Sequence, residues 1–515
     1  MPSLLVVFLL ECCFFGWFGD GVSVEVSLTE PIAVTSPSFV GVNIDAASLY
    51  QGTRLDVADV RFRDFACKFG EVRDSPMTLR IGGSAADDLS TFLNSTRHGH
   101  IFLTRDYWDD IIDFVDACGF NLAWDLNMRI GRSTNSSDPW DPQDTLRLLD
   151  HVREKHQSVW ALQLGNEPGH YQTRNGGLPT AKQHGADFVA LDKILSKYYP
   201  PGSNLETKRP RMQGPDVCFG AGTQTQPCAD MSYFRDVLSV LGPSMLTDIT
   251  GHAYGLRGPK KGRVEPSQCT IEAFLNPELF QAQVIAPVSK WKAAMKELAP
   301  ASNFILSETA SAADGGCPNL SNRFVSGFYY MEILGALGDM GVFQVYRQNL
   351  VGYGGINFGS SYALLDPPGW FAGGDQLVPN PDYFTALLYR KLVGTARLKV
   401  DVPSDQYIHA ACAVGGGVVL TYINPSPDAL EVNITFTAGD MPSPCTNYGS
   451  ETAGMVVEKY ILTAPQGNLT SDQVELNGKV LSMSSALEPS NSFHETVVNV
   501  PPFSYGFLVS KASAK

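Results

Sequence analysis

Short apolar runs alternate with amphipathic stretches along most of the chain from Phe39 onward. Parallel strands separated by helices give this pattern, because such strands are buried on both faces and the helices on only one. The apolar runs predict eight strands, at Phe39–Ile44, Met77–Gly82, Asn121–Leu126, Val159–Leu164, Pro210–Gly214, Leu246–His252, Phe304–Ser307 and Val342–Tyr346. The helices expected between them are Tyr107–Cys118, Thr145–Lys155, Lys182–Tyr198, Ser232–Leu241, Pro277–Leu298 and Arg323–Gly338. These units predict an α/β fold, a (β/α)8 TIM barrel, with a doubly wound sheet as the alternative.

The pattern changes after about Arg397. The segments that follow alternate in polarity, are rich in β-branched residues and are separated by Gly, Pro and Asn, which is typical of a β-sandwich. They are Val418–Ile423, Glu431–Phe436, Val456–Leu462 and Tyr505–Val509. The N-terminal run Val22–Leu28 alternates in the same way. We therefore expect a barrel over residues 24–395 and a C-terminal β-sandwich over residues 396–515, joined by the strand at 22–30.

The N-terminus carries an apolar run, Leu4–Leu10 and then Cys12–Phe18, that ends in small residues near Ser23. This arrangement predicts a signal peptide over residues 1–23, although Glu11 interrupts the run and the first residues include no Lys or Arg. The alternatives are an uncleaved membrane anchor and a buried helix. We expect a secreted protein, extracellular or in a lysosome-like or vacuole-like compartment, which would associate with a membrane if the segment is retained. Association with extracellular matrix is also compatible with this expectation.

Composition indicates a globular chain, because 44% of the residues are hydrophobic and only 18% are charged. The formal net charge of −15 argues against a nucleic-acid partner, whose phosphates an acidic protein repels.

Eight cysteines remain once the leader is excluded, an even number that suits an oxidising compartment. Their spacing suggests bridges between Cys218 and Cys228 and between Cys412 and Cys445, and it leaves the other pairings, or free buried thiols, open. The glycosylation pattern N-x-S/T, which accords with secretion, occurs at Asn94, Asn135, Asn319, Asn433 and Asn468.

Two predicted strands end abruptly in a carboxylate. The run 162–164 leads into Asn166-Glu167-Pro168, and the run 304–307 leads into Glu308. In a barrel these side chains would lie at the carboxyl ends of the fourth and seventh strands, where active sites of this fold are built. Two facing carboxylates can hydrolyse a glycosidic bond with retention, because one protonates the leaving oxygen and the other attacks the anomeric carbon. Taken alone, each segment is also compatible with a carboxylate in a surface turn.

Several short motifs occur in a specific order along the chain. They are Leu79-Arg80-Ile81-Gly82-Gly83-Ser84, Gly165-Asn166-Glu167-Pro168, Gly251-His252-Ala253-Tyr254, Ser307-Glu308-Thr309-Ala310-Ser311, and Val378-Pro379-Asn380-Pro381-Asp382-Tyr383 followed by Lys391-Leu392-Val393-Gly394-Thr395. Together they resemble the heparanase and β-glucuronidase group, glycoside hydrolase family 79, over roughly residues 22–509. The resemblance implies that Glu167 is the acid/base and Glu308 the nucleophile. The further substrate contacts that it implies are Asn43, Asp45, Ser84, Asn166, His252, Tyr254 and Tyr362.

The chain departs from animal heparanase in two places. No excisable internal linker is evident between the second predicted strand and Tyr107, so we expect a single-chain enzyme. The loop after Glu167 reads Gly169-His170-Tyr171-Gln172-Thr173-Arg174 without a lysine pair, which weakens the case for heparan sulfate. A basic cluster follows Tyr254 and would contact an anionic glycan or lie in a solvated loop; its members are Arg257, Lys260, Lys261 and Arg263.

The predicted chemistry needs no cofactor. The pair His98 and His100 has no carboxylate cluster at ligand spacing, so we expect no metal site. The leading hypothesis is a β-glucuronidase acting on a carbohydrate that contains uronic acid. The alternatives are a barrel glycosidase for a neutral β-glycoside and a catalytically silent glycan-binding protein at the cell surface. For the leading hypothesis we expect an acidic pH optimum, because the acid/base must be protonated while the nucleophile is ionised.

Overall fold

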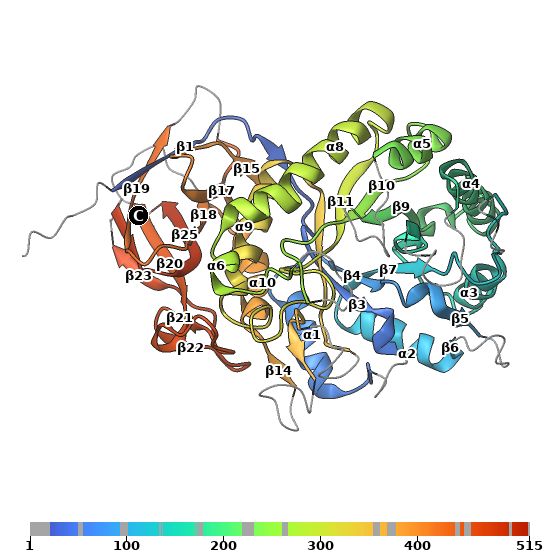
Figure 1. Cartoon of the computed structure of the whole chain (residues 1–515), viewed down its shortest axis with the longest axis horizontal. Helices are drawn as coiled ribbons and strands as arrows, with labels where there is room; N and C mark the ends of the chain where they lie inside the picture. The colour runs from blue at the N-terminus through green and yellow to red at the C-terminus, as the bar shows by residue number, and fades with distance from the viewer. Residues whose placement is uncertain are drawn as a thin grey trace, which may run out of the picture.

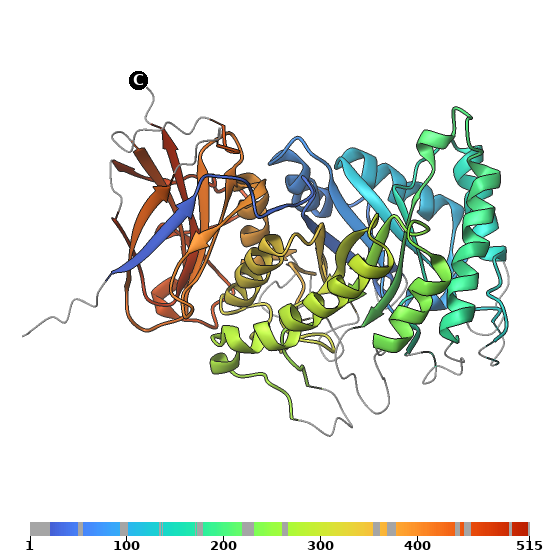
Figure 2. The same cartoon turned by 90° about the horizontal axis from the view of Figure 1, so that it is seen from above.

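The computed structural model describes residues 21–49, 55–92, 101–132, 135, 137–169, 171, 179–218, 231–259, 266–353, 361–367, 377–437, 443–446, 455–493 and 497–512. Two bodies are visible in Figures 1 and 2: a barrel ringed by helices at one end and a body of strands at the other.

The first body is a closed barrel of parallel strands, each paired with its neighbour in chain order until the last pairs with the first. The strands are β3 (Val40–Asp45), β4 (Met77–Gly82), β7 (Phe120–Leu126), β8 (Ala161–Leu164), β9 (Arg211–Cys218), β10 (Asp248–His252), β11 (Asn303–Thr309) and β12 (Gln344–Arg347). Each coincides with one of the eight predicted strands within a few residues. The predicted (β/α)8 fold is therefore confirmed, and the doubly wound alternative is excluded.

Helices surround the barrel and bury their apolar faces against it in one large core. They are α1 (Val60–Glu71), α2 (Arg105–Ala117), α3 (Gln143–Glu154), α4 (Ala181–Tyr198), α5 (Met231–Leu241), α6 (Ile271–Phe274), α7 (Pro277–Phe280), α8 (Ala286–Leu298), α9 (Ser326–Asp339) and α10 (Pro381–Leu392). The predicted helix at 277–298 is α7 and α8 joined by a π-helical turn, Gln281–Ile285. Helices α1 and α10 are not among the predicted ones, although the buried Phe62, Phe65, Ala66 and Phe69 of α1 recur at helical spacing.

Several of these helices begin directly after a residue whose side chain caps the first turn. The side chain of Asp59 accepts the N–H of Arg61 before α1, Thr104 accepts the N–H of Tyr107 in α2, and Thr180 accepts that of Gln183 in α4. Each cap satisfies a backbone donor that has no partner within the helix, and so fixes where the chain turns from loop into helix.

The second body consists of two sheets packed face to face. One has the order β16-β1-β19-β24 and the other the order β2-β15-β17-β18-β25-β20-β21-β22, with β23 also paired to β20. The first sheet comprises β1 (Val22–Ser27), β16 (Val400–Asp401), β19 (Leu430–Thr437) and β24 (Val497–Val500). The second comprises β2 (Ala33–Val34), β15 (Val393–Leu398), β17 (Tyr407–Ala413), β18 (Val418–Asn424), β20 (Met455–Thr463), β21 (Glu475–Leu476), β22 (Lys479–Val480), β23 (Ser490–Phe493) and β25 (Ser504–Ala512). Inward side chains from both sheets form a second core, so the body is a β-sandwich.

The N-terminal strand β1 belongs to this sandwich, where it runs parallel to β19 and antiparallel to β16. Its Val24 and Val26 are fully buried in the second core, whereas Glu25 between them is exposed. Residues 22 and 23, which the predicted leader includes, lie in this folded strand. Gly21 is exposed just before the strand, and residues 1–20 lie outside the described residues.

Two helices join the barrel to the sandwich. Helix α9 contacts β17, β18 and β25, and α10 contacts β15 and β25. Polar contacts strengthen this junction, because His409 on β17 lies 2.7 Å from Asp339 and 3.1 Å from Glu332, both on α9. Two short ribbons complete the described strands, formed by β5 (Leu89–Thr91) with β6 (Ile101–Leu103) and by β13 (Leu365–Asp366) with β14 (Val378–Pro379).

Disulfides link Cys67 to Cys118, Cys269 to Cys317, and Cys412 to Cys445. The last of these confirms a predicted bridge. Cys218 is also disulfide-bonded, but the predicted partner Cys228 lies outside the described residues.

Within the described part of the chain, we find no helix with both the length and the apolar character that crossing a membrane requires.

Most of the chain separates β1 from the other strands of its sheet in the sequence. Substitutions in β1 therefore test whether the stability of the sandwich depends on this strand. We expect Val26→Ala to lower the free energy of unfolding by about 2 kcal/mol, since it removes two buried methyl groups and leaves a cavity. The measurement is the urea midpoint of the purified variant. Val34→Ala, at a side chain that is 63% exposed, is the matched control and should leave the midpoint unchanged. Equal midpoints for wild type and Val26→Ala would mean that β1 is dispensable.

Candidate active site

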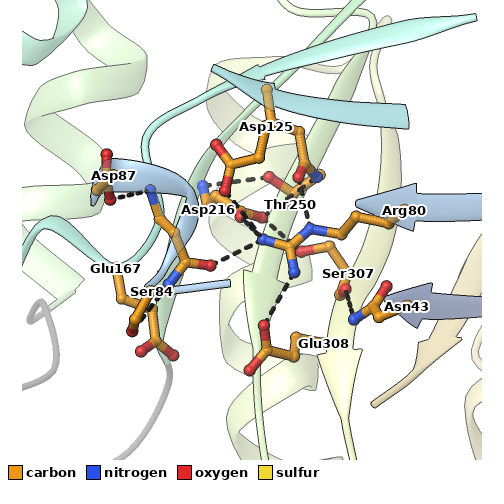
Figure 3. Close-up of polar contacts among 12 residues, drawn as sticks. Asn43, Arg80, Ser84, Asp87, Asp125, Glu167, Asp216, Thr250, Ser307 and Glu308 are labelled. Atoms are coloured by element: carbon orange, nitrogen blue, oxygen red, sulfur yellow. Dashed lines mark hydrogen bonds and ion pairs between the residues drawn. The ribbon is translucent and has the colours of Figure 1, made fainter. Parts of the chain in front are cut away.

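The two glutamates lie at the carboxyl ends of barrel strands, as Figure 3 shows. Glu167 follows β8, the fourth strand of the barrel, and Glu308 lies on β11, the seventh. Both are nearly buried, with 9% and 7% of their surface exposed. The strand register helps to assemble the site, because a bulge between Gly251 and His252 on β10 places His252 directly beside Glu308.

A histidine lies between the two carboxylates. Nδ1 of His252 is 2.8 Å from Oε1 of Glu167 and 3.8 Å from Oε2 of Glu308. Oxygen atoms of Glu167 and Glu308 and a ring nitrogen of His252 all lie within 4.8 Å of one another. On the other side of Glu308, the hydroxyl of Tyr254 donates to Oε1. Both glutamates are therefore held in defined orientations.

Arg80, on β4, is the hub of the polar network beneath the two glutamates (Figure 3). It has no exposed surface, and its guanidinium can satisfy its donors only inside the barrel. The guanidinium donates to Gln163 (2.6 Å), Asp216 (2.6 Å), Asn166 (2.8 Å), Glu308 (2.9 Å) and Asp125 (3.4 Å). One side chain thus links the second, third, fourth, fifth and seventh strands of the barrel.

Asp216, on β9, is a second centre of this network. It accepts the hydroxyl of Ser307 at 2.6 Å, and its Oδ1 lies 3.1 Å from Nε2 of His252. Burial by itself would raise the pKa of Asp216, but the charges of Arg80 and His252 outweigh it and hold that pKa well below the usual range. The carboxylate is therefore ionised throughout the working pH range.

The same charges act on the basic partners. Burial alone would lower the pKa of His252, but Asp216 and Glu308 raise it to about 10. Burial likewise opposes the charge of Arg80, and its carboxylate neighbours raise its pKa above the ordinary value. Asp125 differs, because burial is the dominant influence and raises its pKa well above the usual range. The network thus combines two cations with an ionised Asp216 and a carboxyl group that favours its neutral form.

The remaining predicted site residues surround this core. Asn43 is buried and donates its amide to the carbonyl of Ser307 at 3.1 Å. Oδ2 of Asp45 accepts from Gln348 at 3.0 Å, and burial followed by the charge of Glu308 raises the pKa of Asp45 to about 6. Ser84 lies 3.5 Å from the amide of Asn166.

Two tyrosines line the same region. The rings of Tyr254 and Tyr362 are stacked with centroids 6.2 Å apart, and Tyr362 shares hydrogen bonds with Tyr353 and Gln348. All nine predicted catalytic and substrate-binding residues therefore lie around one end of the barrel.

The predicted surface features are only partly described. Of the basic cluster, Arg257 is half-buried, and Lys260, Lys261 and Arg263 lie outside the described residues. Among the glycosylation candidates, Asn135, Asn319 and Asn468 are exposed and Asn433 is half-buried, whereas Asn94 lies outside the described residues.

Glu167, His252 and Glu308 are close enough to be considered as a metal site. Both ring nitrogens of His252 face carboxylates, and its raised pKa means that both carry protons. A doubly protonated imidazole is a hydrogen-bond donor and has no lone pair for a metal. The contacts among the three groups are those of a charge network, in which the imidazole faces carboxylates on both sides.

Four residues of this network have no role predicted from the sequence: Arg80, Asp125, Gln163 and Asp216. Each places a charged or amide side chain in a barrel strand whose residues are nearly all buried. A polar residue inside a strand that is buried on both faces needs a partner, so this placement is the signal that would have identified them.

The chain is similar to known proteins. Residues 75–335 match the family model described as glycosyl hydrolase family 79, N-terminal domain. The chain is 28% identical to heparanase of Bos taurus over 436 residues, which cover 81% of this chain and 69% of that protein. It is 25% identical to baicalin-beta-D-glucuronidase of Scutellaria baicalensis over 479 residues, covering 84% of this chain and 80% of that protein.

A solved structure shares the fold. It is the 4-O-alpha-L-rhamnosyl-beta-D-glucuronidase of Fusarium oxysporum 12S, with a TM-score of 0.63 and 14% identity, covering 94% of this chain and all of that one.

The charge network predicts that replacing Arg80 lowers the free energy of unfolding substantially. We expect Arg80→Met to lower the free energy of unfolding by about 3–5 kcal/mol near pH 7, because it leaves buried carboxylates without a counter-charge. Asp216 contributes stability above its ordinary pKa and loses it as the pH falls, so the difference from wild type should shrink below about pH 4. Urea unfolding at several pH values measures both effects. Arg61→Met, on an exposed arginine, should cause no measurable loss of stability. An equally small loss for Arg80→Met would mean that the buried carboxylates do not need its charge.

We expect His252 to contribute to stability with a pH dependence opposite to that of Asp216. The raised pKa of His252 means that it stabilises the fold fully below about pH 6.5 and loses that contribution as the pH rises through about 10. We therefore expect the stability difference between wild type and His252→Gln to be constant from pH 5 to 6.5 and to decline towards pH 10. His156→Gln, at an exposed histidine, is the control and should show no such trend. A difference that vanished by pH 7 would mean that His252 titrates normally.

Proposed function

The chain belongs to glycoside hydrolase family 79, and from that premise we propose that it cleaves β-linked glucuronides with retention, through Glu308 as nucleophile and Glu167 as acid/base. The observation that carries the proposal is the pair of facing carboxylates, with oxygen atoms within 4.8 Å of each other. Retaining glycosidases hold their carboxyl groups about 5 to 5.5 Å apart, whereas inverting enzymes leave about 6.5 to 9.5 Å for a water molecule.

The two steps follow from the positions of these groups. Glu308 attacks the anomeric carbon while Glu167 gives its proton to the leaving oxygen, so the glycosidic bond breaks and a covalent glycosyl-enzyme forms. Glu167, now a carboxylate, then takes a proton from water, and that water displaces Glu308 from the sugar. Tyr254 and Arg80 donate to Glu308 and support its role as an oriented, ionised nucleophile.

The neighbouring side chains have supporting roles in the proposal. The amide of Asn166 donates to the sugar 2-hydroxyl, since its oxygen is already engaged by Arg80. His252 orients Glu167, and Asp45 and Ser84 contact further hydroxyl groups. Tyr254 and Tyr362 line the subsite, with Tyr362 towards the uronate carboxylate. On the rim, Arg257 would meet an anionic glycan together with Lys260, Lys261 and Arg263.

We also propose that the protein is exported. Three disulfides join residues that are far apart in the sequence, and such bonds form and persist in oxidising compartments. Their presence supports the expectation of a cleaved leader and a secreted, lysosome-like or vacuole-like location. N-terminal sequencing of the secreted protein tests it directly.

Hydrolysis of phenyl β-D-glucuronide, whose leaving group needs protonation, tests the enzymatic proposal between pH 4 and 8. We expect turnover by the wild type with an acidic optimum, and a loss of about 10²-fold to 10⁴-fold or more in both Glu167→Ala and Glu308→Ala. The matching aryl β-glucoside, which lacks only the uronate carboxylate, is the substrate control and should be turned over more slowly. Maximal activity at alkaline pH would contradict the acid/base assignment.

Added azide separates the two roles. In Glu308→Ala the anion can attack from the vacated side while Glu167 protonates the leaving group, which gives an α-glucuronosyl azide. In Glu167→Ala it attacks the glycosyl-enzyme and gives the β-azide. Azide products of the opposite configuration would mean that Glu167 is the nucleophile and Glu308 the acid/base. A wild type that binds glucuronides without turnover would support the alternative of a silent glycan-binding protein.

A further inference from the structure

Glu167 lies on a short segment of backbone that is held from three sides. The N–H of Gly165 donates to the carbonyl of Leu126 on β7, and the N–H of Glu167 donates to the carbonyl of Asp216 on β9, both at 2.9 Å. Between them, the N–H of Asn166 donates to a carboxylate oxygen of Asp87 at 3.0 Å. Three consecutive donors at the end of β8 therefore point to three different elements.

This segment adopts an unusual backbone conformation. Gly165 has a φ of +76° and Glu167 a φ of +45°. Both lie in the left-handed region of backbone conformation, which residues other than glycine rarely adopt. Such a conformation costs of order 1–3 kcal/mol and persists only where the surrounding contacts impose it. The position of the Glu167 carboxylate therefore depends on the contacts that hold its neighbours.

Asp87 is the side chain that makes these contacts. It lies in the 3-10 turn Ala86–Asp88, after the second barrel strand, and is fully buried. Its Oδ2 accepts the N–H of Asn166, and its Oδ1 accepts both the N–H of Met128 at 3.0 Å and the hydroxyl of Tyr171 at 2.8 Å. One carboxylate thus ties the turn after β4 to the segments that follow β7 and β8.

Packing connects the same residues a second time. A Cβ added at Gly165 would lie 2.6 Å from the hydroxyl oxygen of Tyr171 and 2.8 Å from Cβ of Met128. These are the two residues whose donors meet at Oδ1 of Asp87. Hydrogen bonding and close packing therefore place the end of β8 against one buried carboxylate.

We propose that Asp87 is a positioning residue for the acid/base, setting the location of the Glu167 carboxyl group through the Asn166 N–H and the Tyr171 hydroxyl. The inference rests on the proposed function, because it presumes that Glu167 protonates the leaving group. Asp87 itself does not touch the substrate in this role.

A misplaced acid has a kinetic signature that general loss of stability lacks. A leaving group of high pKa needs protonation as the bond breaks, whereas a nitrophenolate of low pKa departs with little help. The constant kcat/KM reports only the steps up to this departure. Losses caused by a displaced Glu167 should therefore be large for phenyl β-D-glucuronide and small for the 2,4-dinitrophenyl glucuronide.

The test compares kcat/KM for these two substrates in the full-length wild type, Asp87→Asn and Glu167→Ala. In Asp87→Asn an amide group meets donors that converge on the carboxylate, so the end of β8 must shift. We expect a loss of about 10²-fold on the phenyl substrate, the scale of a displacement of about 1 Å, and of less than about tenfold on the dinitrophenyl substrate. Glu167→Ala should show the same discrimination more strongly.

Asp187→Asn is the matched control. Asp187 is also a buried aspartate that accepts a backbone N–H, from Trp140 at 3.1 Å, and side-chain donors from Gln183 and Arg132. It lies on α4 and has no described contact with the end of β8. The substitution Asp187→Asn should lower the thermal midpoint of unfolding, while the ratio of kcat/KM for the two substrates stays at the wild-type value.

The outcomes separate the two hypotheses. Equal losses on both substrates in Asp87→Asn, with discrimination retained in Glu167→Ala, would overturn the role of Asp87 alone. Equal losses in Glu167→Ala would overturn the acid/base assignment, and the role of Asp87 with it. If Asp87→Asn does not fold, Tyr171→Phe removes one of the donors and keeps the carboxylate. It should show a loss of about tenfold, again confined to the phenyl substrate, and an unchanged ratio would overturn the proposal.

Discussion

The end of the barrel that carries the two glutamates depends on the compensation of buried charge. Carboxylates at this depth are stable only with a cation and hydrogen-bond donors nearby, and Arg80 supplies both. Because a guanidinium is planar and presents five N–H donors, it reaches partners from several strands at once, which an ammonium group does not do. The positions of Glu308, Asn166 and Asp216 are thereby coupled to one side chain on β4.

Backbone hydrogen bonds and backbone conformations also position the site residues. Asp216 contributes through its side chain and also through its carbonyl, which accepts the N–H of Glu167. Since Asp216 and Glu167 both have positive φ values, the two neighbouring strand ends are each turned out of regular strand geometry where they meet. The bulge on β10 adds to this by placing His252 beside Glu308. Regular strands bring the residues to one end of the barrel, and local irregularities direct them at each other.

The sandwich and the barrel are joined through α9 and α10, and the sandwich includes the first strand of the described chain. Its two sheets therefore depend on residues from both ends of the sequence, with β1 between strands from the C-terminal part. The hydrophobic pattern predicted the sandwich because its strands alternate in polarity. It predicted the barrel because eight apolar runs are separated by helices. It did not reveal the turns at the rim, whose signals are short or shared with other structures, and α1 was overlooked although its buried residues recur at helical spacing.

By itself the sequence determined the fold class and the two strand ends that carry Glu167 and Glu308, because hydrophobic periodicity and strand-end polarity are local properties. Cysteine spacing only suggested the bridge between Cys412 and Cys445, which the structure confirms. The sequence also determined the family, through motifs in a fixed order. Only the tertiary structure decided which polar residues share one network. Arg80, Asp125 and Asp216 are far apart in the sequence, as are Asp87 and Asn166, and these partners meet only when the barrel closes. Their protonation follows from burial and from neighbours supplied by other strands, and neither can be read from local pattern.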